Sequence, residues 1–197
     1  MFRKRPLRPV RPFNRWIAGR PIYQNQFSPE IKEAHRLFDS GDFIKSGQLF
    51  LELAEKALEK GIPQAPNLFL KSAACFLRGE ENEKGEQLII RGLNLFAQRK
   101  QWRKIIISSS ITINKLRDIG QQDMAKRIGN WVEGNVPDEI RQSDKWKKAG
   151  GLKPRSETKL PDKCQVCGGP VDPKEIEWFN SDAVICSFCG CGISNAT

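Results

Sequence analysis

The sequence predicts a mainly α-helical protein, in which stacked helical hairpins are followed by a small C-terminal module built around cysteines. Three observations lead to this prediction. Apolar residues recur at helical spacing from residue 28 to residue 136, as they do on one face of an amphipathic helix. Part of this pattern repeats at a constant offset of thirty-eight residues. Five of the six cysteines lie in the last thirty-four residues, and their spacing is typical of metal ligands.

Residues 1–27 form a basic, proline-rich leader. The chain has a net charge of +10, and most of it comes from this segment, because no acidic residue precedes Glu30. Its prolines exclude a regular helix, and it lacks the apolar core of a signal peptide. Two interpretations stay open: a solubilising tail or strap along the next domain, or a basic arm for nucleic acid, anionic lipid or an acidic protein groove. The arm would bind through Arg3, Lys4, Arg5, Arg8 and Arg11.

Residues 28–136 are expected to form the helical repeat domain. Ser28-Pro29-Glu30 is a helix start signal, because serine caps a helix and proline suits its first turn. The alignment at offset thirty-eight pairs Gly41, Gly47, Phe50, Ala54 and Leu58 with Gly79, Gly85, Leu88, Gly92 and Phe96. A third, weaker unit runs from Trp102 to Gly134. Periods in this range indicate stacked helix pairs that cannot bury their apolar faces alone.

Two further stretches of this domain need interpretation. Residues 105–113 are rich in β-branched side chains, but the neighbouring segments on both sides are helical. We therefore predict a buried helix there. Cys75 lies inside a helical pattern, which favours a buried structural thiol.

Small and large residues alternate along these helices. The first helix and its turn carry Ala34, Leu37, Gly41 and Phe43, and the next helix carries Phe50 and Ala54. Over residues 29–134 this pattern resembles tetratricopeptide repeats. The resemblance implies a concave surface for protein binding. The repeat is a few residues longer than the family norm, and no helix-ending proline recurs in step. A plain bundle of helical hairpins is the alternative.

Residues 137–163 form a polar connector. Gly150-Gly151 breaks the chain, and Pro154 and Pro161 follow. The first part is compatible with an extension of the last helix. The rest predicts a flexible tether that lets the C-terminal module move relative to the helices.

Residues 164–197 contain two matched Cys-x-x-Cys-Gly turns. The pairs Cys164/Cys167 and Cys186/Cys189 are separated by eighteen residues, and each pair supplies two soft ligands for a tetrahedral metal ion. Glycine follows each pair because the backbone must fold back over the metal with a positive φ. The sequence therefore predicts one structural Zn²⁺ held by these four cysteines. Two interpretations of Cys191 stay open: a spectator thiol, or a ligand in place of Cys189.

This tail resembles the zinc-ribbon class from Cys164 to about Ile193. The class implies short strands packed over a closed metal site that folds only with its metal. Nothing in the sequence predicts an active site. The only histidine, His35, is expected on the first helix, and neither a phosphate-binding glycine loop nor a nucleophile elbow is present. No run of eighteen apolar residues occurs, so we expect no membrane span. The crowded cysteines favour a reducing cytoplasm.

Three binding functions remain. The first is a non-catalytic adaptor that uses the helical repeat surface and the tethered zinc ribbon to bind proteins. In the second, the tail resembles a reduced, single-zinc RING finger of a bacterial ubiquitin-like conjugation system. That resemblance implies a conjugating enzyme as partner, met by Val166, Trp178 and Phe188, although a full RING needs eight ligands. In the third, the leader binds nucleic acid, while the acidic ribbon does not favour phosphate.

Overall fold

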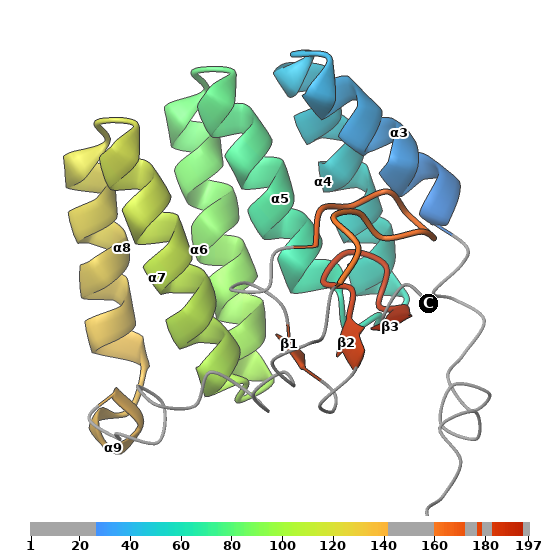
Figure 1. Ribbon diagram of the computed structural model, residues 1–197. Coiled ribbons are helices and arrows are strands. Elements are labelled where there is room, and N and C mark those ends of the chain that lie inside the picture. Colours follow the sequence, from blue (N-terminus) through green and yellow to red (C-terminus); the bar gives the residue numbers. More distant parts are fainter. Residues whose placement is uncertain (1–26, 142–159, 172–176, 179–182, 195–197) are drawn as a thin grey trace, which may run out of the picture.

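The computed structural model describes residues 27–141, 160–171, 177–178 and 183–194. Figure 1 shows the first six helices of this part ranged side by side in chain order, each antiparallel to the next. Helix α4 packs against α3 and α5, α5 against α6, and α7 against α8. The prediction of a mainly helical protein is confirmed. The helices are α3 (Ser28–Asp39), α4 (Phe43–Glu59), α5 (Ala65–Arg78), α6 (Asn82–Gln98), α7 (Trp102–Asp118), α8 (Gln122–Asn135) and the short α9 (Asp138–Arg141).

The five turns from α3 to α8 share one geometry. In each turn a backbone N–H donates to the carbonyl five residues earlier, as from Asp42 to Leu37 at 2.9 Å and from Gln121 to Leu116 at 2.8 Å. The residue before that donor has a positive φ, as in a Schellman helix ending. This geometry recurs every nineteen or twenty residues, so the described helices follow a regular spacing. The positive-φ residues are Gly41, Gly61, Glu80, Lys100 and Gly120.

The repeat alignment is off by one residue at the turn between α5 and α6. The sequence paired Gly41 with Gly79, but Glu80 takes the left-handed conformation, with a φ of 65°. Gly79 serves packing instead, because a Cβ there would lie 2.3 Å from Cδ1 of Ile44. The hairpin spacing in the structure is therefore thirty-nine residues at this turn. Membership of the tetratricopeptide class stays a prediction.

The core of the helical body is built from aromatic and aliphatic side chains of neighbouring helices. Phe50, Phe69, Phe76 and Phe96 are fully buried. Cys75 is also fully buried, with its sulfur 3.4 Å from Oγ of Ser46. Burial raises the pKa of this thiol, as expected where the charged form is desolvated. The prediction of a buried structural thiol is confirmed.

The β-branched stretch at residues 105–113 is helical, as predicted, and lies within α7. Its burial is only partial, however. Within this stretch Ile105 and Ser109 are buried, whereas Ile107 and Ile111 are half-buried. The prediction of a helix is therefore confirmed, but the predicted burial holds only for part of its surface, because one face of α7 borders a hollow rather than another helix.

The C-terminal module contains a small antiparallel sheet in the order β1-β2-β3. Its strands are β1 (Glu177–Trp178), β2 (Ala183–Ile185) and β3 (Gly192–Ser194). Val184 of β2 pairs with Trp178 on one side and with Ile193 on the other. Such short strands cannot form an independent core, so other interactions must hold the module together.

The module lies against the helical body, near α3, α4 and α5 (Figure 1). Asn67 of α5 donates from Nδ2 to the carbonyl of Ser187 at 2.9 Å. Lys163 forms an ion pair with Asp39 at 3.1 Å. The sequence predicted a mobile module and no such docking. Most of the predicted connector, residues 142–159, lies outside the described residues, and the domain boundaries stay predictions.

The leader also lies outside the described residues, apart from the buried Phe27 that precedes α3. The binding role expected for Arg3, Lys4, Arg5, Arg8 and Arg11 stays a prediction. Among the described helices, none has the length and apolar character needed to cross a membrane.

Candidate metal centre

Two matching backbone turns present the cysteines. In the first, Gly168 N–H donates to the Cys164 carbonyl at 2.7 Å, and in the second Gly190 N–H donates to the Cys186 carbonyl at 2.9 Å. Both glycines have a φ of 72°, which an L side chain rarely adopts. The predicted fold-back of each Cys-x-x-Cys-Gly turn is confirmed.

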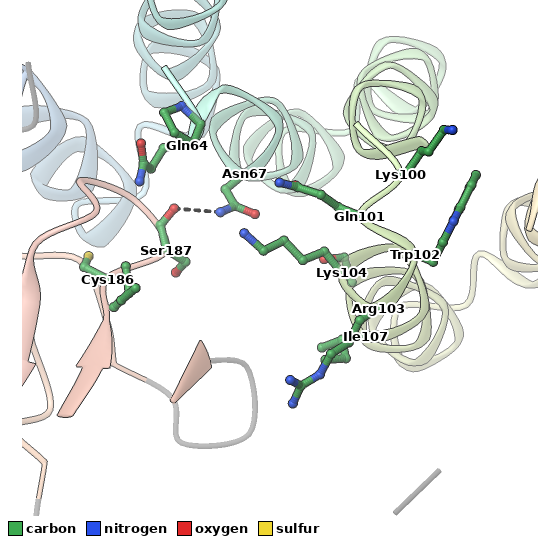
Figure 2. Close-up of a pocket in the computed structure, with 13 residues that line it drawn as sticks. Gln64, Asn67, Lys100, Gln101, Trp102, Arg103, Lys104, Ile107, Cys186 and Ser187 are labelled. Carbon is green, nitrogen blue, oxygen red and sulfur yellow. Dashed lines mark hydrogen bonds between the residues drawn. The ribbon is translucent and has the colours of Figure 1, made fainter. Parts of the chain in front are cut away.

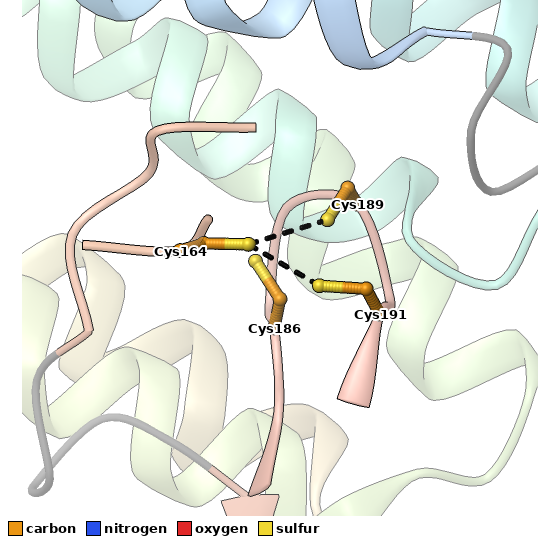
Figure 3. Close-up of side chains that lie close together, drawn as sticks. All are labelled: Cys164, Cys186, Cys189 and Cys191. Carbon is orange, nitrogen blue, oxygen red and sulfur yellow. Dashed lines mark hydrogen bonds between the residues drawn. The ribbon is translucent and has the colours of Figure 1, made fainter. Parts of the chain in front are cut away.

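The two turns direct their sulfurs toward one point. Cys164, Cys186, Cys189 and Cys191 have their Sγ atoms within 4.8 Å of one another. Figure 3 shows these four side chains pointing inward from the two turns. Cys164 Sγ lies 3.8 Å from Cys189 and 3.2 Å from Cys191. Four sulfurs this close can hold a metal ion.

Cys167 stands at the edge of this group, with its sulfur 3.7 Å from that of Cys186. In a tetrahedral site with metal–sulfur bonds of about 2.3 Å, sulfurs are separated by about 3.8 Å. The sulfur–sulfur distances Cys164–Cys189 and Cys167–Cys186 match this value, whereas the distance Cys164–Cys191 is shorter. Five sulfurs therefore compete for four positions. The predicted ligand set of Cys164, Cys167, Cys186 and Cys189 stays a prediction, and Cys191 lies close enough to replace one of them.

The chemistry of the cluster favours a cation. All five sulfurs belong to free thiols, and four of these cysteines are buried. Hydrogen bonds from neighbouring thiols, that of Cys167 above all, hold the pKa of Cys164 well below its ordinary value. The contact with Cys164 in turn raises the pKa of Cys167 and of Cys191. The contact with Cys164 also acts to raise the pKa of Cys186, but hydrogen bonds with Cys167, Cys189 and Cys191 lower the pKa of Cys186 to about 3. Lowered pKa values agree with metal binding, because ligand thiols must lose their protons.

His35 of α3 lies where the cysteine module meets the helices. Its side chain is 5% exposed, and its ring is packed edge-on against Phe188 of the module at 4.8 Å and Phe50 of α4 at 5.1 Å. Burial, reinforced by the positive charge of Lys71, lowers the pKa of His35 to about 4. The imidazole is therefore neutral at pH 7 and acts as a packing group. It is not part of the four-sulfur group.

Gly169 makes this close packing of the module on α3 feasible. A Cβ at this position would lie 2.5 Å from the Phe188 ring and 3.0 Å from His35 Nε2. Neither Gly169 nor Asn67 was predicted from the sequence as an interface residue. The only sequence signal was the second glycine directly after the Cys-x-x-Cys-Gly turn, and it does not identify a partner surface.

Three residues were expected to meet a conjugating enzyme, and the structure describes the side chains of two of them. Val166 and Phe188 are half-buried and pack against the core, and Phe188 contacts the chain's own His35. Of Trp178 the structure describes only the backbone, in β1. Their predicted role in partner binding stays a prediction.

Comparisons of the chain with protein-family models, curated proteins and solved structures found no match. Its class therefore follows from the geometry. The chain is a mainly helical protein with a cluster of four close cysteines that could hold a metal ion.

Proposed function

We propose that this chain is a zinc-binding adaptor that joins proteins through one surface, made by the helices and the cysteine module together. The proposal has two parts: zinc in the cysteine cluster, and a binding role for the combined surface. Neither part requires a reacting group in the chain.

Zinc is the metal that best suits the donor set. Four thiolate sulfurs in a tetrahedral arrangement are typical of structural zinc sites, and such a closed site leaves no position for a reactive water. The strands of the module have only two or three residues each. Metal binding would therefore contribute most of the free energy that keeps the module folded.

The docking of the module on the helical body is the observation that carries the adaptor proposal. Cys186 and Cys189 flank Ser187 and Phe188, and these two residues contact Asn67 and His35 of the helices. A metal that orders this turn also orders the surface that the turn shares with α3 and α5. Partner binding should accordingly depend on the metal.

The test compares the double substitution Cys164→Ser and Cys186→Ser with Cys75→Ala as the control, because Cys75 is a thiol outside the cluster. Removing two of the five close sulfurs leaves too few for a four-sulfur site. Elemental analysis should find one zinc per chain in the natural protein and in Cys75→Ala, and a large loss in the double variant. Proteins cross-linked to the natural chain should be recovered with Cys75→Ala and lost with the double variant or after chelation. Absence of zinc, or an unchanged set of cross-linked proteins after its removal, would contradict the proposal.

A further inference from the structure

Two adjoining hollows lie between α5, α7 and the turn that carries Cys186. Their volumes are about 380 Å³ and about 220 Å³. Both are lined by Asn67 of α5, Ile107 and Ser108 of α7, and Ser187 of the module. We call them together the basic groove. One of its walls therefore belongs to the candidate metal centre.

The charge of the basic groove differs from that of the rest of the helical body. From residue 27 to residue 141 the chain has eighteen lysines and arginines against sixteen aspartates and glutamates, so it is almost neutral. No acidic residue is among the described residues that line the groove, whereas five cationic residues line it. The described lining therefore has a positive formal charge, and these cations also have contacts within the chain; Lys71, for example, lies over the rings of Phe38 and Phe188. The five cations are Lys71, Lys100, Arg103, Lys104 and Lys115.

The polar lining contains side chains that can pair with a peptide backbone. Gln64, Asn67 and Gln101 are carboxamides, which donate and accept hydrogen bonds at once, as a peptide group does. The Oε1 atoms of Gln64 and Gln101 are buried and have no hydrogen-bond partner among the described residues. Figure 2 shows Gln101 and Lys104 extending across the groove toward Asn67 and Ser187.

The apolar lining comes mainly from one face of α7. Ile107 and Ile111 are four residues apart and line the groove together with Leu70 of α5, since residues four apart share a helix face. Both isoleucines are only half-buried. This face therefore offers apolar surface between the cations.

We propose that the basic groove binds an extended, acidic segment of a partner protein that also carries apolar side chains. The cations suit its carboxylates, the carboxamides its peptide groups, and the isoleucines its apolar side chains. From Trp102 to Lys115 helix α7 rises by about 20 Å, which matches an extended segment of about six residues. This inference rests on the adaptor function and identifies the chemistry of one partner.

The lining favours a peptide over a single-stranded nucleic acid. Proteins that bind single strands stack the bases on exposed aromatic rings. The aromatic residues lining the groove are Trp102 and Phe188, and the Phe188 ring is already packed edge-on against His35. Isoleucines and carboxamides along the groove instead match the alternating side chains and the backbone of a peptide.

The test measures binding of fluorescent probes to the full chain loaded with zinc. The probes are an eight-residue peptide in which Glu and Leu alternate, the same peptide with Gln in place of Glu, and an eight-nucleotide oligothymidylate. The groove variant is the double substitution Lys100→Glu with Lys104→Glu. The matched control is Lys45→Glu with Lys126→Glu, which reverses two exposed charges outside the groove. Lys100→Gln with Lys104→Gln replaces the first variant if it fails to fold by circular dichroism.

We expect the acidic peptide to bind the natural chain at least about tenfold more tightly than its Gln counterpart, with the affinity falling as salt rises. The groove variant should lose about tenfold in affinity, whereas the control should stay within about twofold. Ile107→Ser should weaken the peptide but leave the oligothymidylate unchanged. Tighter binding of the oligothymidylate than of the peptide, or an equal loss in groove and control variants, would overturn the proposal.

Zinc content distinguishes this inference from the function on which it rests. If the groove variants keep one zinc per chain and still form the metal-dependent cross-links, but the peptide does not bind, the groove proposal alone fails. If the natural chain holds no zinc, the adaptor function fails first.

Discussion

At the scale of single residues, His35 shows how one side chain links the two parts of the chain. It belongs to α3, yet its ring packs against Phe188 of the cysteine module as well as against Phe50 of α4. Burial of a group that charges near neutrality makes the contact sensitive to acid. The pKa of His35 is lowered to about 4 from an ordinary 6.5, so the folded chain binds this proton less readily than the unfolded chain.

The free energy of unfolding should therefore decrease as the pH falls from 6.5 toward 4, and be insensitive to His35 above pH 6.5. The full loss is up to about 3 kcal/mol, because each pH unit in this window corresponds to about 1.4 kcal/mol. His35→Gln, which stays neutral, should lack this decrease. Urea denaturation of both proteins at several pH values in excess zinc measures the difference. Thiolate protonation affects both proteins alike, so parallel pH profiles would contradict the prediction.

At the scale of elements, the five similar turns determine how the helices follow one another. Three of the left-handed positions hold glycine, but Glu80 and Lys100 hold residues with side chains, at φ values of 65° and 53°. A left-handed conformation costs an L residue about 1–2 kcal/mol. The same turn geometry thus forms with and without glycine, because the helices on either side are held by their buried faces.

Glu80→Gly should raise the free energy of unfolding by about 0.5–1 kcal/mol, since relief at the turn exceeds the extra freedom of glycine in the unfolded chain. Gly120→Ala should lower it by about 1 kcal/mol. A Cβ at Gly120 has no neighbour within 4 Å, so only the backbone conformation is tested there. Urea midpoints of the two variants in excess zinc measure both effects. Shifts of the same sign would be inconsistent with the assigned turn geometry.

At the scale of the whole molecule, the candidate metal centre and the helical body share a surface. Asn67–Ser187, Asp39–Lys163 and His35–Phe188 connect segments more than one hundred residues apart. The module's small sheet has little core of its own, so a metal held by the cysteines and this docking would support each other.

Removal of the metal by a chelator should release the module and expose the helix faces beneath it. Hydrogen–deuterium exchange should increase in peptides that cover β2, β3 and the segments around His35 and Asn67. Peptides of α8, which makes none of these contacts, should exchange unchanged and serve as the internal control. An increase spread evenly over all helices would instead mean that the metal stabilises the whole body.

The features that could be predicted from the sequence are those that depend on residues close together in the chain. The turns at Gly168 and Gly190 were predicted because they depend on residues within five positions of each other. Gly79 was misassigned, because a glycine serves either a positive φ or a close approach, and only the neighbour Ile44 distinguishes them. The incomplete burial of α7 was not predicted for the same reason. Its apolar residues have the pattern of core residues, and only the opposing surface shows that some of them are half-buried.

The sequence by itself determined the helices, their approximate spacing and the cysteines that gather at one point, because helical periodicity and ligand spacing are local properties of the chain. Only the tertiary structure decided that the cysteine module lies on α3 and α5 and that Cys191 reaches the sulfur cluster. It also decided that five cations, and no acidic side chain of the described residues, line one groove. These features join residues far apart in sequence, and the packing of rings, glycines and carboxamides at the shared surface brings them together.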